Sequence, residues 1–474
     1  MARSKDRNSI LRALPSVDAL LKTDTARGLA NELGPTRVTS LARLATEDLR
    51  QRLLLNSSQG SAGANGDDAF RSELLKQAEQ RLVELHRIDE ASGVHRVINA
   101  TGVVLHTNLG RAPLSDAARR AIDQASGYCT LEYDTAAGSR GPRAARAENL
   151  LLELTGAQGA LIVNNCAAAA LLVLNTFARD GEAVISRGEL VEIGGDFRVP
   201  DIMAQSGAHM IEVGTTNRTR VSDYRGAINE RSRLVMRVHT SNYRIVGFTK
   251  VPSLAELATL TRGAGLPLYE DAGSGALIDF NNYGIAGEPV IRESIEAGAD
   301  VVSFSGDKLV GGPQAGLLVG RAELIERMRS NPLYRALRAD KLRLAALEAT
   351  LSAYSRKEKV PTLEMIAMTP EQIEKRAKKL IRKVYRNRAD TLTLEPIKSE
   401  SAVGGGSAPI SSLPTVAISI AQEGVTAKKI AELLRRWNPP IIARIVNDRV
   451  LIDLRTVALT DESEVERALT SLAS

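Results

Sequence analysis

The chain has 474 residues, a net charge of +6 and a pI near 9.3, with 43% hydrophobic and 25% charged residues. This length exceeds one compact core, so we expect two or three domains of ordinary globular composition. Cys129 and Cys166 provide neither a disulfide framework nor metal-ligand spacing, as is typical of a reducing compartment. No apolar run approaches the length of a membrane span or of a signal peptide, so we expect a cytoplasmic protein without a membrane segment. Because no cluster of metal-ligating residues is seen, we also expect no metal site.

Residues 1–55 are predicted to form a small helical N-terminal domain. Residues 14–18, Leu-Pro-Ser-Val-Asp, have the features of a helix start, and Val38, Leu41 and Leu44 repeat at helical spacing in a second segment. The domain contains ten basic and six acidic residues. This surplus suits contacts with a phosphate backbone, but it is equally typical of a solvated basic surface.

Residues 56–96 are expected to hold a linker and a connecting helix. Residues 56–68 are rich in Asn, Gly and Ser, which is typical of a flexible linker, and a leucine-lined helix is predicted over about residues 70–89. A large catalytic domain is expected over residues 97–345 and a smaller α/β domain over residues 346–474.

In the large domain, short apolar strands alternate with helices, which is typical of a mostly parallel α/β sheet with helices on both faces. The expected strands are Ala183–Ser186, His209–Val213, Leu234–His239, Leu266–Glu270, Asp300–Phe304 and Gly316–Val319, and the expected helices include Leu254–Arg262 and Val290–Glu296. Sites in such sheets lie at the carboxyl ends of the strands. The candidate residues at those ends are Asn165, His239, Asn242, Asp271, Ser305 and Lys308.

Residues 160–170, ALIVNNCAAAA, predict a strand, a short polar turn and an alanine-rich helix. Backbone N–H groups at such a helix start can bind a phosphate. The turn alone is a weak signal, because many strand-to-helix turns share it. Loops rich in polar residues, Gly and Arg at 98–113 and 138–143 are typical of the borders of a site.

Lys308 follows an apolar strand and stands in SFSGDKLVGGPQAG, residues 303–316. The pattern indicates a Schiff-base lysine whose amine attacks a carbonyl, although a loop lysine in a tight turn fits the motif as well. Asp271 ends another predicted strand in PLYEDAGSG. Taken alone, Asp271 fits a helix N-cap better. Together the two residues meet the needs of pyridoxal 5'-phosphate (PLP), which requires an acid at its ring nitrogen and a lysine at its aldehyde.

The smaller domain is predicted to begin with a basic helix over residues 371–388, which has eight basic and two acidic residues. Its exposed face suits tRNA but is more typical of a solvated surface. Its predicted apolar stripe is Ile373, Ala377, Leu380, Ile381 and Val384. A flexible loop is expected over Ser399–Ser412, with strands at Thr415–Ile420, Ile441–Ile445 and Val450–Asp453.

The order of phosphate turn, acid and lysine resembles that of the fold-type-I PLP-dependent transferases. Nearly the whole chain is similar to the bacterial selenocysteine synthase family, the L-seryl-tRNA(Sec) selenium transferases. The similarity lies in INATGVVLHTNLGRAPLS, LEYD…GSRG, IVNNCAAAALL, SRGELVEIGGDFRVPD, EVGTTNRT, VHTSNYRIVGFT, DAGSG, SFSGDKLVGGPQAG and NPLYRALRADKLRLAALEATL, in this order. The resemblance implies a fold-type-I large domain, a helical tRNA-binding N-terminal domain and a smaller α/β C-terminal domain.

The resemblance also implies a role for each matching residue. Lys308 would bind the PLP aldehyde and shuttle the proton at Cα, and Asp271 would pair with the ring nitrogen. The other cofactor-binding residues would be Asn242 at the 3-oxygen, His239 over the ring, Asn165, Cys166, Ala167 and Ser305 at the phosphate, and Arg140 at the phosphate of a neighbouring subunit's cofactor. The selenium-donor site would be formed by Arg111, Arg335 and Arg338, the last two at i and i+3 on one helix face.

The implied reaction converts L-seryl-tRNA(Sec) to L-selenocysteinyl-tRNA(Sec) with selenophosphate, through a PLP-bound dehydroalanyl intermediate. The implied assembly is a homo-oligomer, a pentamer of dimers. Two alternatives stay open: a PLP-dependent lyase or transferase acting on a free amino acid or amino sugar, and a non-catalytic RNA-binding protein on an enzyme scaffold. Arg335, Arg338 and the basic N-terminus argue against the first, and the retained Asp271 and Lys308 argue against the second.

Overall fold

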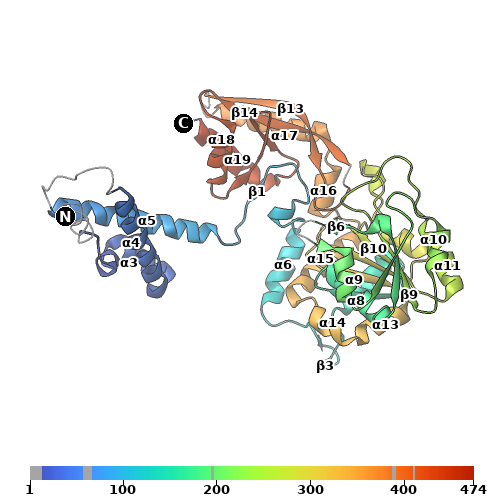
Figure 1. Cartoon of the computed structure of the whole chain (residues 1–474). Helices are drawn as coiled ribbons and strands as arrows, with labels where there is room; N and C mark the ends of the chain where they lie inside the picture. Colours follow the sequence, from blue (N-terminus) through green and yellow to red (C-terminus); the bar gives the residue numbers. More distant parts are fainter. Residues whose placement is uncertain (1–12, 57–66, 194–196, 387–390, 409–410, 474) are drawn as a thin grey trace. The chain divides into compact units, whose positions relative to one another are not determined.

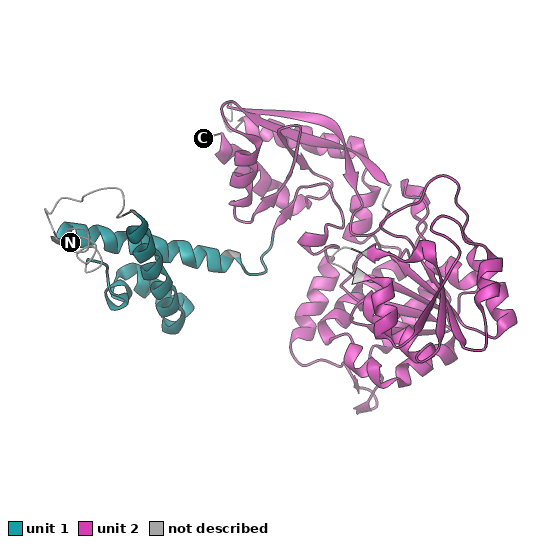
Figure 2. Ribbon diagram, viewed as in Figure 1, with its two compact units in different colours: residues 1–96 teal, residues 97–474 magenta. Residues whose placement is uncertain are grey.

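The computed structural model describes residues 13–56, 67–193, 197–386, 391–408 and 411–473. Two compact units divide the chain, residues 1–96 and residues 97–474 (Figure 2). Four of the ten basic N-terminal residues and most of the expected linker lie outside the described residues. The division expected at residue 345 stays a prediction, because the second unit is continuous across it.

The described residues of the first unit form four helices that share one apolar core (Figure 1). They are α2 (Val17–Leu21), α3 (Asp24–Leu33), α4 (Pro35–Asn56) and α5 (Asp67–Ala91). Ser16 caps α2 by accepting a hydrogen bond from the backbone N–H of Ala19, as expected of a helix start. Leu74 and Leu82 of α5 are buried in the same core, so α5 belongs with the N-terminal helices and is not a separate connecting helix.

The apolar stripe expected on α4 is wrong at one position. Val38 and Leu41 are buried, but Leu44 is 54% exposed and Ala45 lies in the core instead. The buried residues of α4 are Val38, Leu41, Ala42, Ala45 and Leu49. They are spaced by three or four residues, as on one face of a helix, whereas a strict repeat of three would include Leu44.

The second unit is organised around a seven-stranded sheet with the strand order β4-β12-β11-β10-β9-β5-β8. Its strands are β4 (Gly159–Val163), β5 (Glu182–Ser186), β8 (His209–Val213), β9 (Ser232–Val238), β10 (Leu268–Gly273), β11 (Val301–Ser305) and β12 (Gly316–Gly320). Only β12 runs antiparallel to its neighbours in this sheet. The mostly parallel sheet is therefore confirmed, with each expected strand present near its expected bounds.

Helices cover both faces of this sheet, as Figure 1 shows. On one face lie α8 (Cys166–Phe177), α9 (Val199–Gln205) and α13 (Ala322–Ser330). On the other lie α7 (Ala145–Thr155), α10 (Val221–Ala227), α11 (Leu254–Ala264), α12 (Ile291–Glu296) and α15 (Lys341–Ser355). Parallel strands need both faces covered, so the carboxyl ends of the strands are the natural place for a site.

The C-terminal part contains a second sheet with the order β13-β14-β17-β16. Its elements are α16 (Pro361–Ala367), α17 (Pro370–Arg386), β13 (Leu392–Ala402), β14 (Ser412–Gln422), α18 (Ala427–Arg435), β16 (Arg444–Val446), β17 (Arg449–Asp453) and α19 (Glu462–Leu472). The predicted apolar stripe of α17 is confirmed, since all five of its residues are buried.

Two expectations for this part are wrong. Residues 399–402 are strand β13, not a flexible loop, because β13 and β14 pair over eleven residues each. The glycine turn that follows packs closely: a Cβ on Gly405 would lie 2.5 Å from the carbonyl oxygen of Leu105. The strand expected at 441–445 is split, and β15 (Ile441–Ile442) pairs instead with β1 (Ile98–Asn99).

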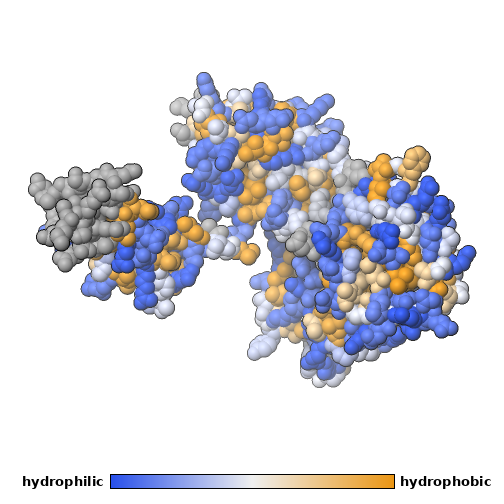
Figure 3. Space-filling model, viewed as in Figure 1, coloured by the Kyte–Doolittle hydropathy of each residue, from blue (hydrophilic) through white to orange (hydrophobic). Residues whose placement is uncertain are grey.

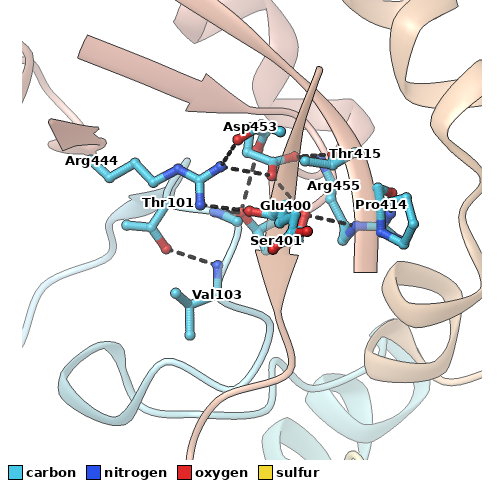
Figure 4. Close-up of polar contacts among 12 residues, drawn as sticks. Thr101, Val103, Glu400, Ser401, Pro414, Thr415, Arg444, Asp453 and Arg455 are labelled. Carbon is cyan, nitrogen blue, oxygen red and sulfur yellow. Dashed lines mark hydrogen bonds and ion pairs between the residues drawn. The ribbon is translucent and has the colours of Figure 1, made fainter. Parts of the chain in front are cut away.

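A buried polar network stabilises the C-terminal sheet around Asp453 and Arg455, which are 0% and 2% exposed (Figure 4). Asp453 accepts hydrogen bonds from Ser401 at 2.7 Å and Thr415 at 3.0 Å. Arg455 donates from its guanidinium to Ser401 and to the backbone carbonyls of Met365, Ile366, Met368 and Pro414. The network thus ties α16 to the strands.

Hydrophilic residues are spread over the visible face of the second unit, with apolar residues among them (Figure 3). Among the described residues, no helix combines the length and apolar character that crossing a membrane requires. Large exposed apolar side chains occur close together in one segment of the second unit, at Val246, Phe248 and Val251.

Candidate active site

The carboxyl ends of β4, β10 and β11 meet at one edge of the large sheet. Asp271 on β10 and Ser303 on β11 are register partners, and Lys308 follows β11 in a turn. The thiol of Cys166, at the start of α8, lies 3.5 Å from Asp271 Oδ1 and 3.9 Å from Ser303 Oγ. The structure therefore brings the predicted acid and the predicted phosphate turn together.

Asp271 is bonded through only one of its carboxylate oxygens. Oδ1 accepts from the backbone N–H of Gly273 at 3.1 Å, from Ser303 Oγ at 3.3 Å and from Cys166 Sγ at 3.5 Å. Within the described residues, no donor contacts Oδ2. Burial raises the pKa of Asp271, while the nearby Lys308 ammonium and these donors oppose the increase. Oδ2 is left for a further donor.

Lys308 is 4% exposed and is therefore not a solvated loop lysine. Its turn is fixed by glycines that no other residue could replace without displacing the backbone. A Cβ on Gly306 would lie 2.6 Å from the carbonyl oxygen of Pro313, and a Cβ on Gly316 would lie 2.1 Å from that of Asn165. The close approach of Gly316 and Asn165 holds the strand that returns from the lysine turn against the start of α8.

The first turn of α8 has the geometry of an anion site. Asn165 is the N-cap, and its side chain accepts a hydrogen bond from the N–H of Ala168 at 2.8 Å. The N–H groups of Cys166 and Ala167 have no partner within the helix, as at any helix start. Burial, and then the charge of Asp271, raise the pKa of the Cys166 thiol, so the thiol stays protonated at neutral pH. Its backbone, not its side chain, is available to a phosphate.

Arg111 lies against the residue that precedes Lys308. Its guanidinium Nη1 donates to Asp307 Oδ2 at 2.7 Å, and the N–H of Ala112 donates to the Asp307 carbonyl at 3.3 Å. Arg111 has a positive φ of 61°, so the loop turns sharply at this residue. The structure thus places Arg111 beside the lysine turn.

Arg335 and Arg338 do not share a helix face, so that prediction is wrong. The helix α14 (Pro332–Leu337) ends one residue before Arg338, which has an extended ψ of 136°. Arg338 pairs with Val163 at the end of β4, and its buried Nε has no hydrogen-bond partner. Arg335 stays on the exposed surface of α14.

Two predicted site residues have no described contact with Asp271 or Lys308. The Arg140 side chain is 79% exposed on the hairpin of β2 (Tyr133–Asp134) and β3 (Ser139–Arg140), and it donates to Glu132 at 2.8 Å. Asn242 is exposed and donates from Nδ2 to the carbonyl of Glu192 at 2.6 Å. Their assigned roles stay predictions.

His239 is held by a carboxylate that the sequence did not reveal. Its backbone N–H donates to the Asp271 carbonyl at 2.9 Å, and its Nε2 lies 3.5 Å from Glu288 Oε2. Glu288 also accepts from Ser274 Oγ and, at 2.6 Å, from the N–H of Ala408. Burial tends to raise the pKa of Glu288, but these three contacts outweigh it and hold the pKa below its ordinary value.

Sequence reasoning also missed Tyr269 and Ser303, the side chains behind Asp271. The Tyr269 hydroxyl and Ser303 Oγ are 2.7 Å apart, and both residues are 0% exposed. A signal was present, because Tyr269 precedes Asp271 by two residues on one strand and so points to the same face of the sheet. No comparable pattern marks Glu288, which precedes α12 in an irregular segment.

Buried polar atoms without partners gather at this edge. They belong to side chains at the ends of β4 and β9 and beside them: Asn164 Oδ1, Ser241 Oγ and Arg338 Nε. Buried polar atoms usually have hydrogen-bond partners, so this group is suited to a polar, anionic ligand. With the free Oδ2 of Asp271, the buried amine of Lys308 and the start of α8, the residues fit PLP.

Comparison with known families agrees with this geometry. A family model described as L-seryl-tRNA selenium transferase matches residues 97–458, and one described as selenocysteine synthase N terminal matches residues 11–50. A Moorella thermoacetica protein named L-seryl-tRNA(Sec) selenium transferase is 47% identical over 469 residues, covering 97% of this chain and 96% of that protein. A Geobacter sulfurreducens protein of the same name is 42% identical over 473 residues, covering 98% and 100%.

Among solved structures, that of D-glucosaminate-6-phosphate ammonia-lyase matches with a TM-score of 0.56. The two share 22% sequence identity, over 81% of this chain and 98% of the other. This likeness concerns the fold alone. Together with the strand order, it confirms the expected fold class, a fold-type-I α/β fold with a helical N-terminal region.

Proposed function

Because the chain belongs to the L-seryl-tRNA selenium transferase family, we propose that it converts L-seryl-tRNA(Sec) to L-selenocysteinyl-tRNA(Sec), with PLP as cofactor and selenophosphate as donor. Identity over nearly the full chain favours this reaction over that of a lyase or transferase acting on a free amino acid or amino sugar. The observation that carries the cofactor proposal is the buried edge where Asp271 keeps one free oxygen near the buried Lys308.

PLP, when bound, supplies an electron sink for negative charge at the Cα of the seryl group. In our proposal Asp271 holds the proton of the ring nitrogen through Oδ2. The N–H groups of Cys166 and Ala167, in the helix turn that Asn165 begins, would bind the phosphate together with Ser305. Lys308 would hold the aldehyde, and its amine would move the proton at Cα.

We assign two further contacts to the cofactor on the same basis. His239, whose backbone is bonded to Asp271, would cover the ring. Asn242 would donate to the 3-oxygen, which requires its amide to leave the carbonyl of Glu192. Arg140, exposed on its hairpin, would reach the phosphate of a cofactor in a neighbouring subunit.

The donor site is proposed around three arginines. Arg111 lies beside the lysine turn, and Arg338, whose Nε has no hydrogen-bond partner, lies beside the end of β4. Arg335, three residues before Arg338, would add a third. A guanidinium fork suits a tetrahedral oxyanion, so selenophosphate is a fitting donor. The serine hydroxyl would leave as water, the selenium of selenophosphate would bond to Cβ, and hydrolysis of its Se–P bond would release phosphate.

The remaining proposals concern partners. The helical residues of the first unit, matched in part by the selenocysteine synthase N-terminal model, would bind the tRNA. The exposed apolar side chains at Val246, Phe248 and Val251 support an assembly of copies, for which we propose a pentamer of dimers in the cytoplasm. Light scattering of the purified protein tests this assembly through its mass.

The experiment that tests the function supplies the PLP-loaded protein with seryl-tRNA(Sec) and selenophosphate containing radioactive selenium. We expect selenium to appear in the aminoacyl group of the tRNA, and no product with free serine. Turnover of a free amino acid or amino sugar in place of seryl-tRNA would support the lyase alternative. Binding of tRNA without any turnover would support the non-catalytic one.

A further inference from the structure

Tyr269 and Ser303 have no part in the function proposed so far, although they form a continuous contact with Asp271. Tyr269 precedes Asp271 by two residues on β10, and Ser303 is the register partner of Asp271 on β11. Side chains alternate along a strand, so all three point to the same face of the sheet. That face is the one that α8 covers, since Tyr269 packs in the same apolar cluster as α8.

The direction of the hydrogen bonds between them follows from their chemistry. An ionised carboxylate only accepts, so Ser303 donates its single hydroxyl hydrogen to Asp271 Oδ1 across 3.3 Å. The lone pairs of Ser303 Oγ are then left to accept, and the Tyr269 hydroxyl donates to it across 2.7 Å. Two hydroxyl groups therefore form a directed relay that ends on one oxygen of Asp271.

The same oxygen receives two further donors. The N–H of Gly273 lies at 3.1 Å and the thiol of Cys166 at 3.5 Å from Oδ1. A carboxylate oxygen offers about two lone-pair sites, so three donors fill Oδ1. A fourth donor that approaches Asp271 has to use Oδ2, which has no partner within the described residues.

We propose that Ser303, held by Tyr269, is a positioning residue that fixes Asp271 with Oδ1 toward the relay and Oδ2 toward the ring nitrogen of the cofactor. The inference rests on the PLP site of the proposed function. Fixing the carboxylate in one rotamer keeps Oδ2 in place before the cofactor arrives, so binding does not have to order it. Ser303 and Tyr269 act through Asp271 and touch no reacting atom.

The relay also helps to keep Asp271 ionised. Burial raises the pKa of Asp271, and the contacts with Lys308, Gly273, Cys166 and Ser303 oppose that effect. Removing the hydroxyl of Ser303 removes one of these contacts, so the carboxyl is expected to accept a proton more readily. A protonated carboxyl is a weaker partner for a cationic ring nitrogen, and the electron sink weakens with it.

The other titratable groups around Asp271 lie on α8, on its own strand β10, and in the segments that follow β11 and β9. Cys166 from α8 and Tyr269 from β10 are kept neutral, because burial raises the pKa of both. Glu270 from β10 also has a raised pKa through burial. Lys308 and His239 complete the set, and neither is changed in the experiment below.

The test measures PLP binding to Ser303→Ala and Tyr269→Phe in the full chain, with two readouts. Visible absorption gives the dissociation constant, and a pH titration of the bound cofactor's band reports the state of its ring. We expect Ser303→Ala to bind PLP about five- to tenfold more weakly and Tyr269→Phe about two- to threefold more weakly. Both variants should shift the pH titration. Ser303→Thr keeps the hydroxyl and should restore binding.

Ser186→Ala is the matched control. Ser186 also ends a strand of this sheet, is 2% exposed and shares a 2.7 Å bond with the hydroxyl of Thr219. It should bind PLP as the wild type does. If Ser303→Ala behaves like this control in both readouts, the inference is overturned while the proposed function stands.

If Ser303→Ala does not fold, the inference is tested with Tyr269→Phe, which keeps the aromatic ring and loses only the hydroxyl. Wild-type affinity and an unchanged pH titration for that variant would overturn the inference. A wild-type chain that binds no PLP would overturn the proposed function and the inference together, so the two failures are distinguishable.

Discussion

The molecule contains two buried acids in similar surroundings, Asp271 at the edge of the large sheet and Asp453 in the C-terminal sheet. Both accept hydrogen bonds from a serine on another strand of the same sheet and from a backbone N–H. They differ in how many of their carboxylate oxygens accept hydrogen bonds. Asp453 accepts through both oxygens, from Thr415 and Ser401, whereas among the described residues Asp271 accepts only through Oδ1.

The cations near these acids differ in the same way. Arg455 donates from all three of its guanidinium nitrogens. Lys308 is buried with no described ion pair, and several polar atoms nearby have no partner. A buried polar network in which every group has a hydrogen-bond partner stabilises a fold. Buried polar groups without partners cost stability, which the rest of the fold has to offset. The difference indicates which of the two regions is built for a ligand.

The largest expected effect on chemistry follows from changing Lys308 to alanine. Without its amine the site loses the group that binds the aldehyde and moves the proton, so selenium transfer should fall on the order of a thousandfold or more. The rate of labelled selenium transfer to tRNA measures this. Lys398→Ala, which changes an exposed lysine on β13, should retain the wild-type rate. An active Lys308→Ala protein would contradict the assignment.

The largest expected effect on stability follows from Arg455→Ala in the satisfied network. The change leaves buried carbonyls of α16 and β14 and the hydroxyl oxygen of Ser401 without their donor, and it removes the cation near the buried Asp453 carboxylate. We expect a loss of about 3–5 kcal/mol in the free energy of unfolding, measured by denaturant titration. Arg449→Ala, an exposed arginine paired with Glu395 on the same sheet, should cost about 1 kcal/mol or less. Equal costs for the two variants would contradict the comparison.

A third buried acid, Glu189, sharpens the comparison through pH. Burial raises its pKa to about 7 from 4.5, although Arg237 and the N–H of Val238 oppose the shift. A raised pKa in the folded state gives stability that is full below the unfolded pKa and is lost as the pH rises through the folded one. The stability of wild type relative to Glu189→Gln should therefore fall between pH 4.5 and 7, by about 3 kcal/mol at most.

This prediction is checked by the difference in melting temperature between wild type and Glu189→Gln at each pH in that range. The contributions of the other titrating groups cancel in this difference. Glu256→Gln serves as a control, since its carboxyl is exposed and its pKa is lowered by the bonds from Ser253. A difference that rises with pH would show that Glu189 is not buried as described.

A smaller effect is expected from Glu288→Gln. The pKa of Glu288 is held low, so the residue is ionised at neutral pH. Its carboxylate contacts His239 and accepts hydrogen bonds from Ser274 Oγ and from the N–H of Ala408. The neutral amide keeps the shape but weakens these contacts. We expect PLP to bind about tenfold more weakly, measured by absorption titration. Glu293→Gln on α12 is the control, and equal affinity for both variants would remove Glu288 from the site.

The smallest effect is expected from alkylation. Cys166 has a raised pKa through burial, whereas Cys129 is exposed. Only a thiolate reacts readily, so iodoacetamide should modify Cys129 first and leave PLP binding nearly unchanged. Peptide mass spectrometry of partly modified protein measures the order. Faster modification of Cys166 would contradict its protonated state beside Asp271.

The sequence predicted the elements with strong local patterns. The strand that contains Asp271, the strand before Lys308 and the buried stripe from Ile373 to Val384 follow from short apolar runs and helical spacing. It did not predict β13, because Glu395, Lys398 and Glu400 interrupt its apolar positions and a glycine-rich turn follows. It also placed Arg338 within a helix that ends one residue earlier.

The site was predictable in part for the same reason. Asp271 and Lys308 stand in local motifs, whereas Glu288 and Ser303 act through contacts with residues far along the chain. Such contacts depend on strand order and loop docking, which local spacing does not specify. Ser303 could be found only once β10 and β11 were known to be neighbours with Asp271 and Ser303 in register.

One measurement tests the central claim most directly, namely that the unsatisfied edge at Asp271 and Lys308 holds the cofactor. The purified full chain is supplied with PLP, treated with borohydride to trap the cofactor on its lysine, digested and analysed by mass spectrometry. We predict a phosphopyridoxyl group on the peptide that contains Lys308, and no label in Lys308→Ala. Label on another lysine, or none in the wild type, would contradict the account.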